Sequence, residues 1–405
     1  MGNDDFDIVI IGGGIVGLAT ALTFIKQYRR QRIALVEKET EVAIHQTGHN
    51  SGVIHSGVYY APGSLKAKLC VSGVQRLLQF ARENNIQYEL CGKIILATKA
   101  EEKPMLEDLW KRGIANGISN LQLIDTNKIK ELEPHATGLC GLYSPQTGII
   151  DFRAVAQAMA RRYVNDGGCL MTNKGITKIT TRGEKHYLFS DQETIRTKYV
   201  VNCGGLFADR IAQIMGLKPK VRIVPIRGEY FTVRPERKFL VKNLIYPVPS
   251  PTLPFLGVHF TRTIDGNLKA GPNAVLALAR EGYRRAEVKL GDLLEMITDL
   301  RFWKMAEKYW KVGLFEAYRA INKNSFVAVL RQFVPEIREE DLVSGPTGVR
   351  AQCIDENGTL VNDFEIMEGW RSIHVLNVPS PAATASLSIA DYIVKLAGRV
   401  FALQS

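Results

Sequence analysis

Three of the seven histidines, His45, His49 and His55, lie together in the segment HQTGHNSGVIHSGVYY, and such a concentration of imidazoles can bind a metal ion. A His-x-x-x-His pair binds one ion only when a helix brings both rings to the same face. Gly48 and Asn50, which lie among these histidines, are residues of turns and loops. The sequence therefore predicts a loop at this position and no metal site.

Another histidine, His259, lies three residues before Arg262 in VHFTR, and the pair has the side chains for acid-base chemistry on an anionic substrate. An imidazole accepts a proton near neutral pH, and a guanidinium holds a carboxylate in a fixed orientation. Positions three apart in a strand point to opposite faces, so the two side chains share a pocket only if a bulge or a turn intervenes. The alternative is a histidine of a sheet and an arginine of the surface.

The elements that would position these residues begin with a strand, a glycine-rich turn and a helix in DIVIIGGGIVGLATALTFI. Gly12 permits the tight turn, Gly14 lets the backbone approach a pyrophosphate, and Gly17 lets helix and strand pack closely. A second predicted strand, Arg32–Val36, is followed by Glu37, whose carboxylate would accept hydrogen bonds from a ribose and repel a 2′-phosphate. This order of elements predicts a Rossmann-like domain that binds NAD or FAD rather than NADP.

Two later segments have a similar strand-to-helix pattern. Tyr199–Asp209 (YVVNCGGLFAD) indicates a buried strand that breaks at two glycines before a helix, a second place where backbone can approach a cofactor. A plain strand-to-helix turn is the alternative there. Ile373–Leu387 (IHVLNVPSPAATASL) indicates a strand, a turn between prolines and a helix, whose N-terminus would stabilise negative charge on a reduced flavin.

The composition limits the class of protein. A chain of 405 residues is long enough for two domains, or for one large α/β domain with an insertion. Its first residues lack the basic flank and the apolar core of a secretory signal, and no apolar run reaches the length of a transmembrane helix, about 18 residues, so neither feature is expected. Its six cysteines are scattered without a Cys-x-x-Cys pair, which indicates free thiols in a reducing compartment.

The formal net charge of +11 is concentrated partly in the block 280–331, where basic residues alternate with large apolar residues at roughly helical spacing. Aromatic side chains beside lysine and arginine suit the interface of an anionic bilayer. The alternative is that the aromatic residues pack inward and the lysines form a solvated face. No nucleic-acid-binding motif accompanies the charge. The large apolar residues are Phe302, Trp303, Trp310, Leu314 and Phe315.

Taken in order, these segments resemble the FAD-dependent oxidoreductases of the D-amino-acid-oxidase (glycine oxidase-like) superfamily over nearly the whole chain. Four strings are similar specifically to those of the L-2-hydroxyglutarate oxidases or dehydrogenases: TGHNSGVIHSGVYYAPGSLKAKLC, GVHFTRTIDGNLKAGPNA, SGPTGVRAQ and NVPSPAATASLSIA. Glycerol-3-phosphate dehydrogenases and malate:quinone oxidoreductases share shorter pieces and remain alternatives.

The resemblance implies an α/β fold, α+β overall, with a Rossmann-like FAD-binding domain and a smaller antiparallel-sheet substrate domain. The FAD-binding domain is expected to be discontinuous. Its expected segments are 1–80, 145–215 and 340–405, and those of the substrate domain are 81–144 and 216–339, including the basic, aromatic helical excursion 280–331.

The resemblance also implies roles for individual residues. His259 is expected to be the general base, with His55 either assisting it or bracing the loop. Arg262, Arg350 and His55 are expected to bind the substrate, and Arg350 also has the flavin edge as an expected partner. The residues expected to bind FAD are Gly12, Gly14, Ile15, Gly17, Glu37, Lys38, Thr47, Asn50, Ser51, Gly52, Val53, Ile176, Cys203, Gly204, Gly205, Arg350, Pro381, Ala382, Ala383 and Thr384.

The activity implied is oxidation of L-2-hydroxyglutarate to 2-oxoglutarate by hydride transfer from C2 to flavin N5. The alternative substrates are another 2-hydroxy acid such as malate, glycerol 3-phosphate or an amino acid, and a non-catalytic or nucleic-acid-modifying flavoprotein is a third hypothesis. A quinone or oxygen is the expected electron acceptor. The expected location is the cytoplasm, with peripheral attachment to an anionic surface on the inner face of the cell membrane and no nucleic-acid partner.

Overall fold

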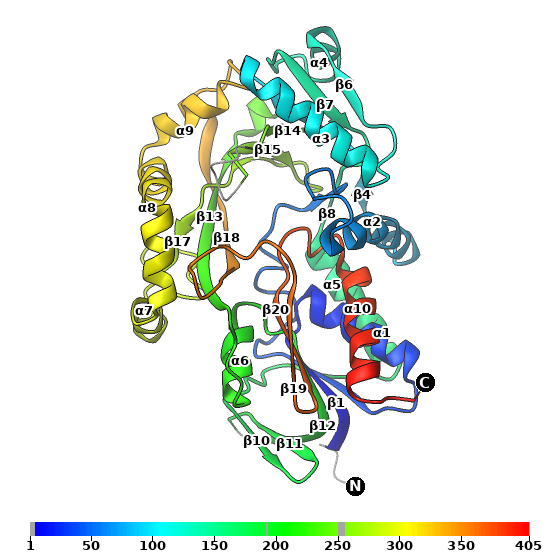
Figure 1. Cartoon of the computed structure of the whole chain (residues 1–405). Coiled ribbons are helices and arrows are strands. Elements are labelled where there is room, and N and C mark those ends of the chain that lie inside the picture. The colour runs from blue at the N-terminus through cyan, green and yellow to red at the C-terminus, as the bar shows by residue number, and fades with distance from the viewer. Residues whose placement is uncertain (1–4, 192, 250–255, 405) are drawn as a thin grey trace.

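The computed structural model describes residues 5–191, 193–249 and 256–404, and its lower half in Figure 1 is built on a parallel sheet. The parallel strands follow the order β20-β12-β1-β2-β9. Their apolar runs are buried because helices and further strands cover both faces, as parallel sheets require. These strands are β1 (Asp5–Ile11), β2 (Ile33–Val36), β9 (Cys169–Met171), β12 (Thr194–Asn202) and β20 (Ser372–Asn377).

One face of this sheet packs on a layer of helices that holds a large apolar core. The helix α1 (Ile15–Gln27) lies between α10 (Ser386–Val400) and α5 (Phe152–Asn165), and α10 also contacts α2 (Leu65–Glu83). The helix α1 is buried along most of its length, as its Ala- and Leu-rich sequence predicts. The sheet is extended by the antiparallel strands β10 (Lys178–Arg182), β11 (Lys185–Phe189) and β19 (Glu365–Gly369).

The upper half in Figure 1 is built on a second, mostly antiparallel sheet of order β17-β13-β16-β15-β14-β5-β7-β6, with β18 on the other edge of β13. The helix α9 (Lys323–Leu330) packs on its outer face. The strands are β5 (Lys93–Ala97), β6 (Gln122–Ile124), β7 (Cys140–Ser144), β13 (Arg222–Val233), β14 (Leu244–Pro247), β15 (His259–Arg262), β16 (Leu268–Gly271), β17 (Val275–Leu276) and β18 (Leu342–Ile354).

A small third sheet connects the two halves, because it continues the loop that follows β2. In it β3 (Val53–Ile54) and β4 (Tyr88–Glu89) both pair with β8 (Gly148–Ile150). Its residues join the apolar cluster on the inner face of the second sheet. The remaining helices of the upper half include α3 (Lys103–Ala115) and α4 (Thr126–Leu132).

The block 280–331 forms three helices, α7 (Leu290–Ile297), α8 (Leu300–Ile321) and α9, along the left edge of the molecule in Figure 1. The predicted α/β class is confirmed. The strand β18 pairs with β13 from Leu342 to Ile354 and so lies in the second sheet. Within the segment 340–405, which was expected to belong to the FAD-binding domain, the chain joins the parallel sheet only after residue 354.

Candidate active site

The turn after β1 has the close contacts that a dinucleotide-binding turn requires. Gly12 has φ +112°, and a Cβ there would lie 2.4 Å from the carbonyl oxygen of Cys203. A Cβ on Gly17 would lie 2.0 Å from the carbonyl oxygen of Gly12, so α1 touches the turn backbone to backbone. By contrast, a Cβ on Gly14 would meet only the Thr47 hydroxyl, at 3.5 Å, which leaves the N-terminus of α1 open for phosphates.

Two side chains hold this turn in place. The carboxylate of Glu37 accepts hydrogen bonds from the backbone N–H of Gly13 at 2.6 Å and of Glu39 at 2.9 Å. The hydroxyl of Thr47 accepts one from the N–H of Ile15 at 3.0 Å. A carboxylate has about four lone-pair sites, so Glu37 retains acceptor capacity for a ribose. These residues fit FAD.

Two further groups of residues expected to bind FAD, Cys203–Gly205 and Ile176, lie on chain segments next to this turn. The backbone N–H of Cys203 donates to the carbonyl of Ile11, which brings Gly204 and Gly205 beside the end of β1. The backbone N–H of Lys174 donates to the carbonyl of Glu37, so the chain before Ile176 runs beside the end of β2. The prediction of a strand broken by glycines before a helix is confirmed by β12 and α6 (Ala208–Ile214).

The turn before α10 is joined to the histidine-rich loop through Thr384. Its hydroxyl donates to the carbonyl of Val53 at 3.3 Å and accepts from the backbone N–H of His55 at 3.2 Å. Pro381, Ala382 and Ala383 precede it in this turn. The two segments that the resemblance places on the flavin therefore lie side by side.

Asn50 stabilises the loop itself. Its amide donates to the carbonyls of Gln46 and Thr47, and its carbonyl accepts from the N–H of Gly52, which has φ +74°. Between Thr47 and Gly52 the loop has no helix. Asn50 therefore fixes the backbone of Ser51 and Gly52, and its side chain is committed to the loop.

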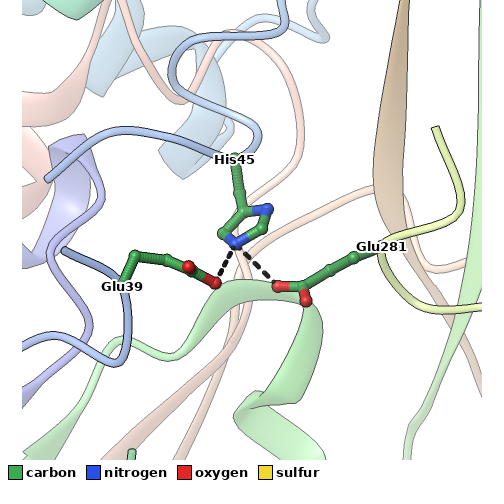
Figure 2. A group of neighbouring side chains, drawn as sticks. All are labelled: Glu39, His45 and Glu281. Carbon is green, nitrogen blue, oxygen red and sulfur yellow. Dashed lines mark hydrogen bonds and ion pairs between the residues drawn. The ribbon is translucent and has the colours of Figure 1, made fainter. Parts of the chain in front are cut away.

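The three histidines of this loop diverge. His49 bonds the carbonyl of Thr347 at 2.8 Å and lies against the ring of Tyr283. His55 instead lies near Lys93 and His259, with its Nδ1 atom buried. His45 lies between the carboxylates of Glu39 and Glu281, as Figure 2 shows. The structure therefore does not bring the three rings to one point.

The group Glu39, His45 and Glu281 has ligand atoms close enough together for a metal ion. However, the ammonium of Lys38 lies 2.8 Å from the Glu281 carboxylate, bonds Glu39, and lies 3.0 Å from His45 Nε2. A positive charge therefore already occupies the neighbourhood of these oxygens. We interpret the group as an ion-pair network that links the loop after β2 to the segment after β17.

On the inner face of the second sheet, His259 has a defined tautomer. Its Nδ1 lies 2.8 Å from the carbonyl oxygen of Gly257, which can only accept, so Nδ1 carries the proton and Nε2 presents a lone pair. The ring stacks on Tyr246 with centroids 3.9 Å apart. Burial lowers the pKa of His259 to about 3, and the positive charges of Arg350 and Lys93 act in the same direction. His259 is thus a neutral imidazole.

His55 lies near His259. Burial lowers its pKa to about 3, and nearby Lys93 and His259 contribute in the same direction. Within the described residues, His55 Nδ1 and the hydroxyl of Tyr59 are buried and have no hydrogen-bond partner. His55 and His259 are therefore brought together, as predicted.

The structure does not bring Arg262 to these two histidines. The strand β15 is regular, so Arg262 points to the opposite face from His259. Its guanidinium makes two hydrogen bonds to Glu89, at 3.1 and 3.0 Å, and one to the carbonyl of Lys242. The prediction that Arg262 shares a pocket with His259 is wrong, because no bulge turns its side chain inward.

Arg350 lies on the inner face instead. A Cβ on Gly228 of the paired strand would lie 3.1 Å from its Nη2, and its charge acts on His259 and Tyr230. The next residue, Ala351, donates its N–H to the side chain of Gln46. Arg350 is therefore near both the base and the loop expected to cover the flavin.

Two further residues near these histidines, Lys93 and Tyr246, were missed by sequence reasoning. Lys93 Nζ lies 4.5 Å from the ring centroid of Tyr59 and 5.1 Å from that of Tyr246. Its signal in the sequence is a lone lysine at the start of the apolar strand KIILA. A charge at the buried end of such a strand is uncommon and marks a candidate site.

Comparison with known proteins identifies the class. Residues 7–396 match the family described as FAD dependent oxidoreductase (DAO), and the chain belongs to this family. L-alpha-glycerophosphate oxidase from Mycoplasma pneumoniae, solved with FAD bound, has a TM-score of 0.79 at 23% identity, covering 97% of this chain and 95% of that one. Glycine oxidase from Geobacillus kaustophilus has a TM-score of 0.70 at 19% identity, covering 98% and 95%. The protein is an FAD-dependent oxidoreductase.

Its sequence relatives are more specific. An L-2-hydroxyglutarate dehydrogenase of Indibacter alkaliphilus is 46% identical over 98% of this chain and 100% of the relative. The human mitochondrial L-2-hydroxyglutarate dehydrogenase is 45% identical over 96% and 88%. The corresponding protein of Salmonella houtenae is 42% identical over 96% and 92%. These identities confirm the resemblance drawn from the four sequence strings.

Proposed function

We propose that the chain oxidises L-2-hydroxyglutarate to 2-oxoglutarate. The names of its relatives support this substrate, and the observation that carries the chemistry is the fixed tautomer of His259, whose Nε2 is free to accept a proton. Bound FAD would supply the acceptor for the hydride that leaves C2. His259 takes the hydroxyl proton as that hydride departs, which balances the conversion of the alcohol to the ketone.

The surrounding charges suit an anionic substrate. In the free protein, burial and the neighbouring cations keep His259 neutral at any ordinary pH. A bound carboxylate offsets the charges of Arg350 and Lys93, so it raises the pKa of His259 and makes it a stronger base when substrate is present. Arg350 is the guanidinium placed to hold a carboxylate near His259.

Anaerobic reduction of the purified holoenzyme tests the substrate. L-2-hydroxyglutarate is expected to bleach the flavin absorbance, whereas L-malate, glycerol 3-phosphate and amino acids reduce it far more slowly or not at all. Faster bleaching by any of these would replace the proposed substrate with that compound.

Substitution of the base tests the chemistry. The variant His259→Asn is expected to keep FAD and to lose about 10²- to 10⁴-fold in the rate of flavin reduction, because the proton acceptor is gone. His135→Asn is the matched control, since His135 is a surface histidine that pairs with Glu336. A His259→Asn enzyme as fast as the control would remove His259 from the mechanism.

We also propose that the enzyme attaches to an anionic membrane surface and passes its electrons to a quinone, with oxygen as the alternative acceptor. Large apolar side chains form an exposed stripe on α8: Leu300, Trp303, Trp310, Leu314, Tyr318 and Ile321 are all more than half exposed. Phe302 and Met305, on the other face of α8, pack inward. No helix of the described residues is long and apolar enough to span a bilayer.

Co-sedimentation with vesicles tests the attachment. Trp303→Ser combined with Trp310→Ser is expected to abolish binding to vesicles containing phosphatidylglycerol at low salt, because aromatic side chains anchor at the interface. Trp370→Ser is the matched control, since Trp370 is 52% exposed on the turn between β19 and β20. Wild-type protein that stays in the supernatant would refute the proposal, and quinone-dependent turnover would separate quinone from oxygen.

A further inference from the structure

The inner face of the second sheet carries a row of polar side chains. The pairing of Leu244 with Lys93, and of Ile245 with Phe260, places Lys93, Tyr246 and His259 on the same face. Arg350 reaches this face from β18. Across the sheet, Arg350 on β18 and Lys93 on β5 therefore lie on either side of His259 on β15.

Lys93 is the unusual member of this row. Its residue is 1% exposed, and within the described residues its ammonium contacts aromatic rings, with no carboxylate acting on its pKa. Its ammonium lies beside the rings of Tyr59 and Tyr246. The hydroxyl of Tyr59 and Nδ1 of His55 are nearby, and neither has a hydrogen-bond partner among the described residues. Aromatic rings offset only part of the cost of burying an amino group, so the position of Lys93 favours binding of an anion that arrives from outside.

We infer that Lys93 binds the carboxylate of the substrate that is remote from the reacting hydroxyl. The inference rests on the proposed dicarboxylate substrate and adds the group that selects it. Two cations flank the base, and a dicarboxylate has one carboxylate for each. Tyr59 and His55 lie beside Lys93 with unused hydrogen-bonding atoms that can complete the same subsite.

The neighbours of Arg350 and Lys93 indicate which carboxylate of the substrate each residue binds. Arg350 adjoins Ala351 and Gly348, which contact Gln46 and His49 of the loop over the flavin site. Lys93 is on β5, which is two strands from β15, or about 10 Å at about 5 Å per strand. The carboxylate next to the reacting carbon therefore belongs to Arg350, and the far one to Lys93.

Binding of an anion is also expected to change the protonation of the Lys93 amine. Burial lowers the pKa of Lys93 to about 7. At pH 8 the free protein therefore holds this amine mostly neutral, and a bound carboxylate restores its proton. The titratable groups that face it are Tyr59, Tyr246, Cys70, His55 and His259. The two histidines, with pKa values near 3, stay neutral between pH 6 and 8.

Kinetics of Lys93→Met and Lys93→Arg with two substrates test the inference. L-2-hydroxypentanoate has a methyl group in place of the remote carboxylate of L-2-hydroxyglutarate. Lys93→Met is expected to lower kcat/KM for L-2-hydroxyglutarate roughly 100-fold, mainly through KM, and to change that for L-2-hydroxypentanoate less than about 3-fold. Lys93→Arg, which keeps the charge, is expected to retain part of the preference for L-2-hydroxyglutarate over L-2-hydroxypentanoate. Equal losses with both substrates, or none, would overturn the inference.

Calorimetry and unfolding provide readouts that a purely structural lysine would not change. Binding of glutarate to the wild-type holoenzyme is expected to take up about one proton at pH 8 and almost none at pH 6, and the uptake disappears in Lys93→Met. The same variant is expected to have a raised Tm, because an unpaired buried amine is replaced by an apolar chain. Unchanged proton uptake in Lys93→Met would contradict the inference.

The two proposals fail in different ways. If L-2-hydroxyglutarate does not reduce the wild-type flavin, the proposed function fails. The role of Lys93 is then judged by equilibrium binding alone, from the perturbation of flavin absorbance by glutarate and by pentanoate. Loss of glutarate binding with unchanged pentanoate binding in Lys93→Met supports the subsite, and equal affinities of the wild type for both acids refute it.

Discussion

The turn after β1 and the inner face of the second sheet differ in whether their polar groups have hydrogen-bond partners within the protein. In the turn, Glu37, Thr47 and Asn50 each form hydrogen bonds with backbone groups of the same region. On the inner face, Nδ1 of His55 and the hydroxyl of Tyr59 are buried, with no partner among the described residues. The cofactor region is thus held in shape by its own bonds, whereas the substrate region keeps bonding capacity for a ligand.

This difference shows how each region is prepared to bind its ligand. The backbone of the turn is fixed before any ligand binds, which lowers the entropy lost on binding. Unsatisfied buried groups cost free energy in the free protein, and a substrate that pairs with them recovers it. The substrate face is therefore expected to tolerate apolar replacements that raise stability, whereas the cofactor turn is not.

The largest effect is expected from Gly17→Ala. Its Cβ would lie 2.0 Å from the backbone carbonyl oxygen of Gly12, and neither atom can move away by a side-chain rotation. We expect no FAD in the purified variant and a fall in Tm of more than 10 °C, measured by the flavin-to-protein absorbance ratio and by thermal unfolding.

Gly313→Ala is the matched control for that substitution. Gly313 lies within α8, and a Cβ there would meet nothing within 4 Å. Alanine stabilises a helix interior by about 1 kcal/mol relative to glycine, so this variant is expected to bind FAD normally and to unfold at the same or a higher temperature. Normal flavin content in Gly17→Ala would show that the turn is not preorganised.

A smaller effect is expected from Thr47→Val, which removes the acceptor of the Ile15 N–H but keeps the shape of the side chain. A buried N–H without a partner costs about 1–3 kcal/mol, so the Kd for FAD is expected to rise about 10-fold or more. Thr47→Ser keeps the hydroxyl and should bind like the wild type. The measurement is fluorescence titration of the apoprotein with FAD, and equal Kd values for Val and Ser would contradict the role of this bond.

The features that sequence reasoning predicted well are those that depend on neighbouring residues. A positive φ at Gly12 and the entry into α1 are local properties of GGGIVG, so the strand, turn and helix could be read directly. The pairing of His55 with His259 came from the resemblance, since the two lie about 200 residues apart and no local pattern joins them.

The features that it missed depend on which face of a strand a side chain takes. Arg262 was grouped with His259 although strand alternation separates them, and the structure follows the alternation. Lys93 was overlooked because its significance comes from Tyr59 and Tyr246, which reach it only through tertiary packing. In the same way, Phe302 and Trp303 are adjacent in sequence, yet only the first is buried.

The smallest effect is expected where the two regions meet, in the network of Lys38, Glu39, His45 and Glu281 (Figure 2). Burial alone would lower the pKa of His45, but its hydrogen bonds to Glu281 and Glu39 raise it above the ordinary value. Stability from a raised pKa is fully present below the unfolded pKa of about 6.5, and it is lost as the pH rises through the folded value.

The variant His45→Gln measures this contribution. At pH 6 its free energy of unfolding is expected to lie about 0.5–1 kcal/mol below that of the wild type, and the gap should close by about pH 9, where the imidazole is neutral in both states. Glu281→Gln should flatten the same pH dependence, because it removes a carboxylate that stabilises the protonated form of His45. A gap of constant size from pH 6 to pH 9 would mean that the junction is held by packing, and that the two regions are joined without the help of charge.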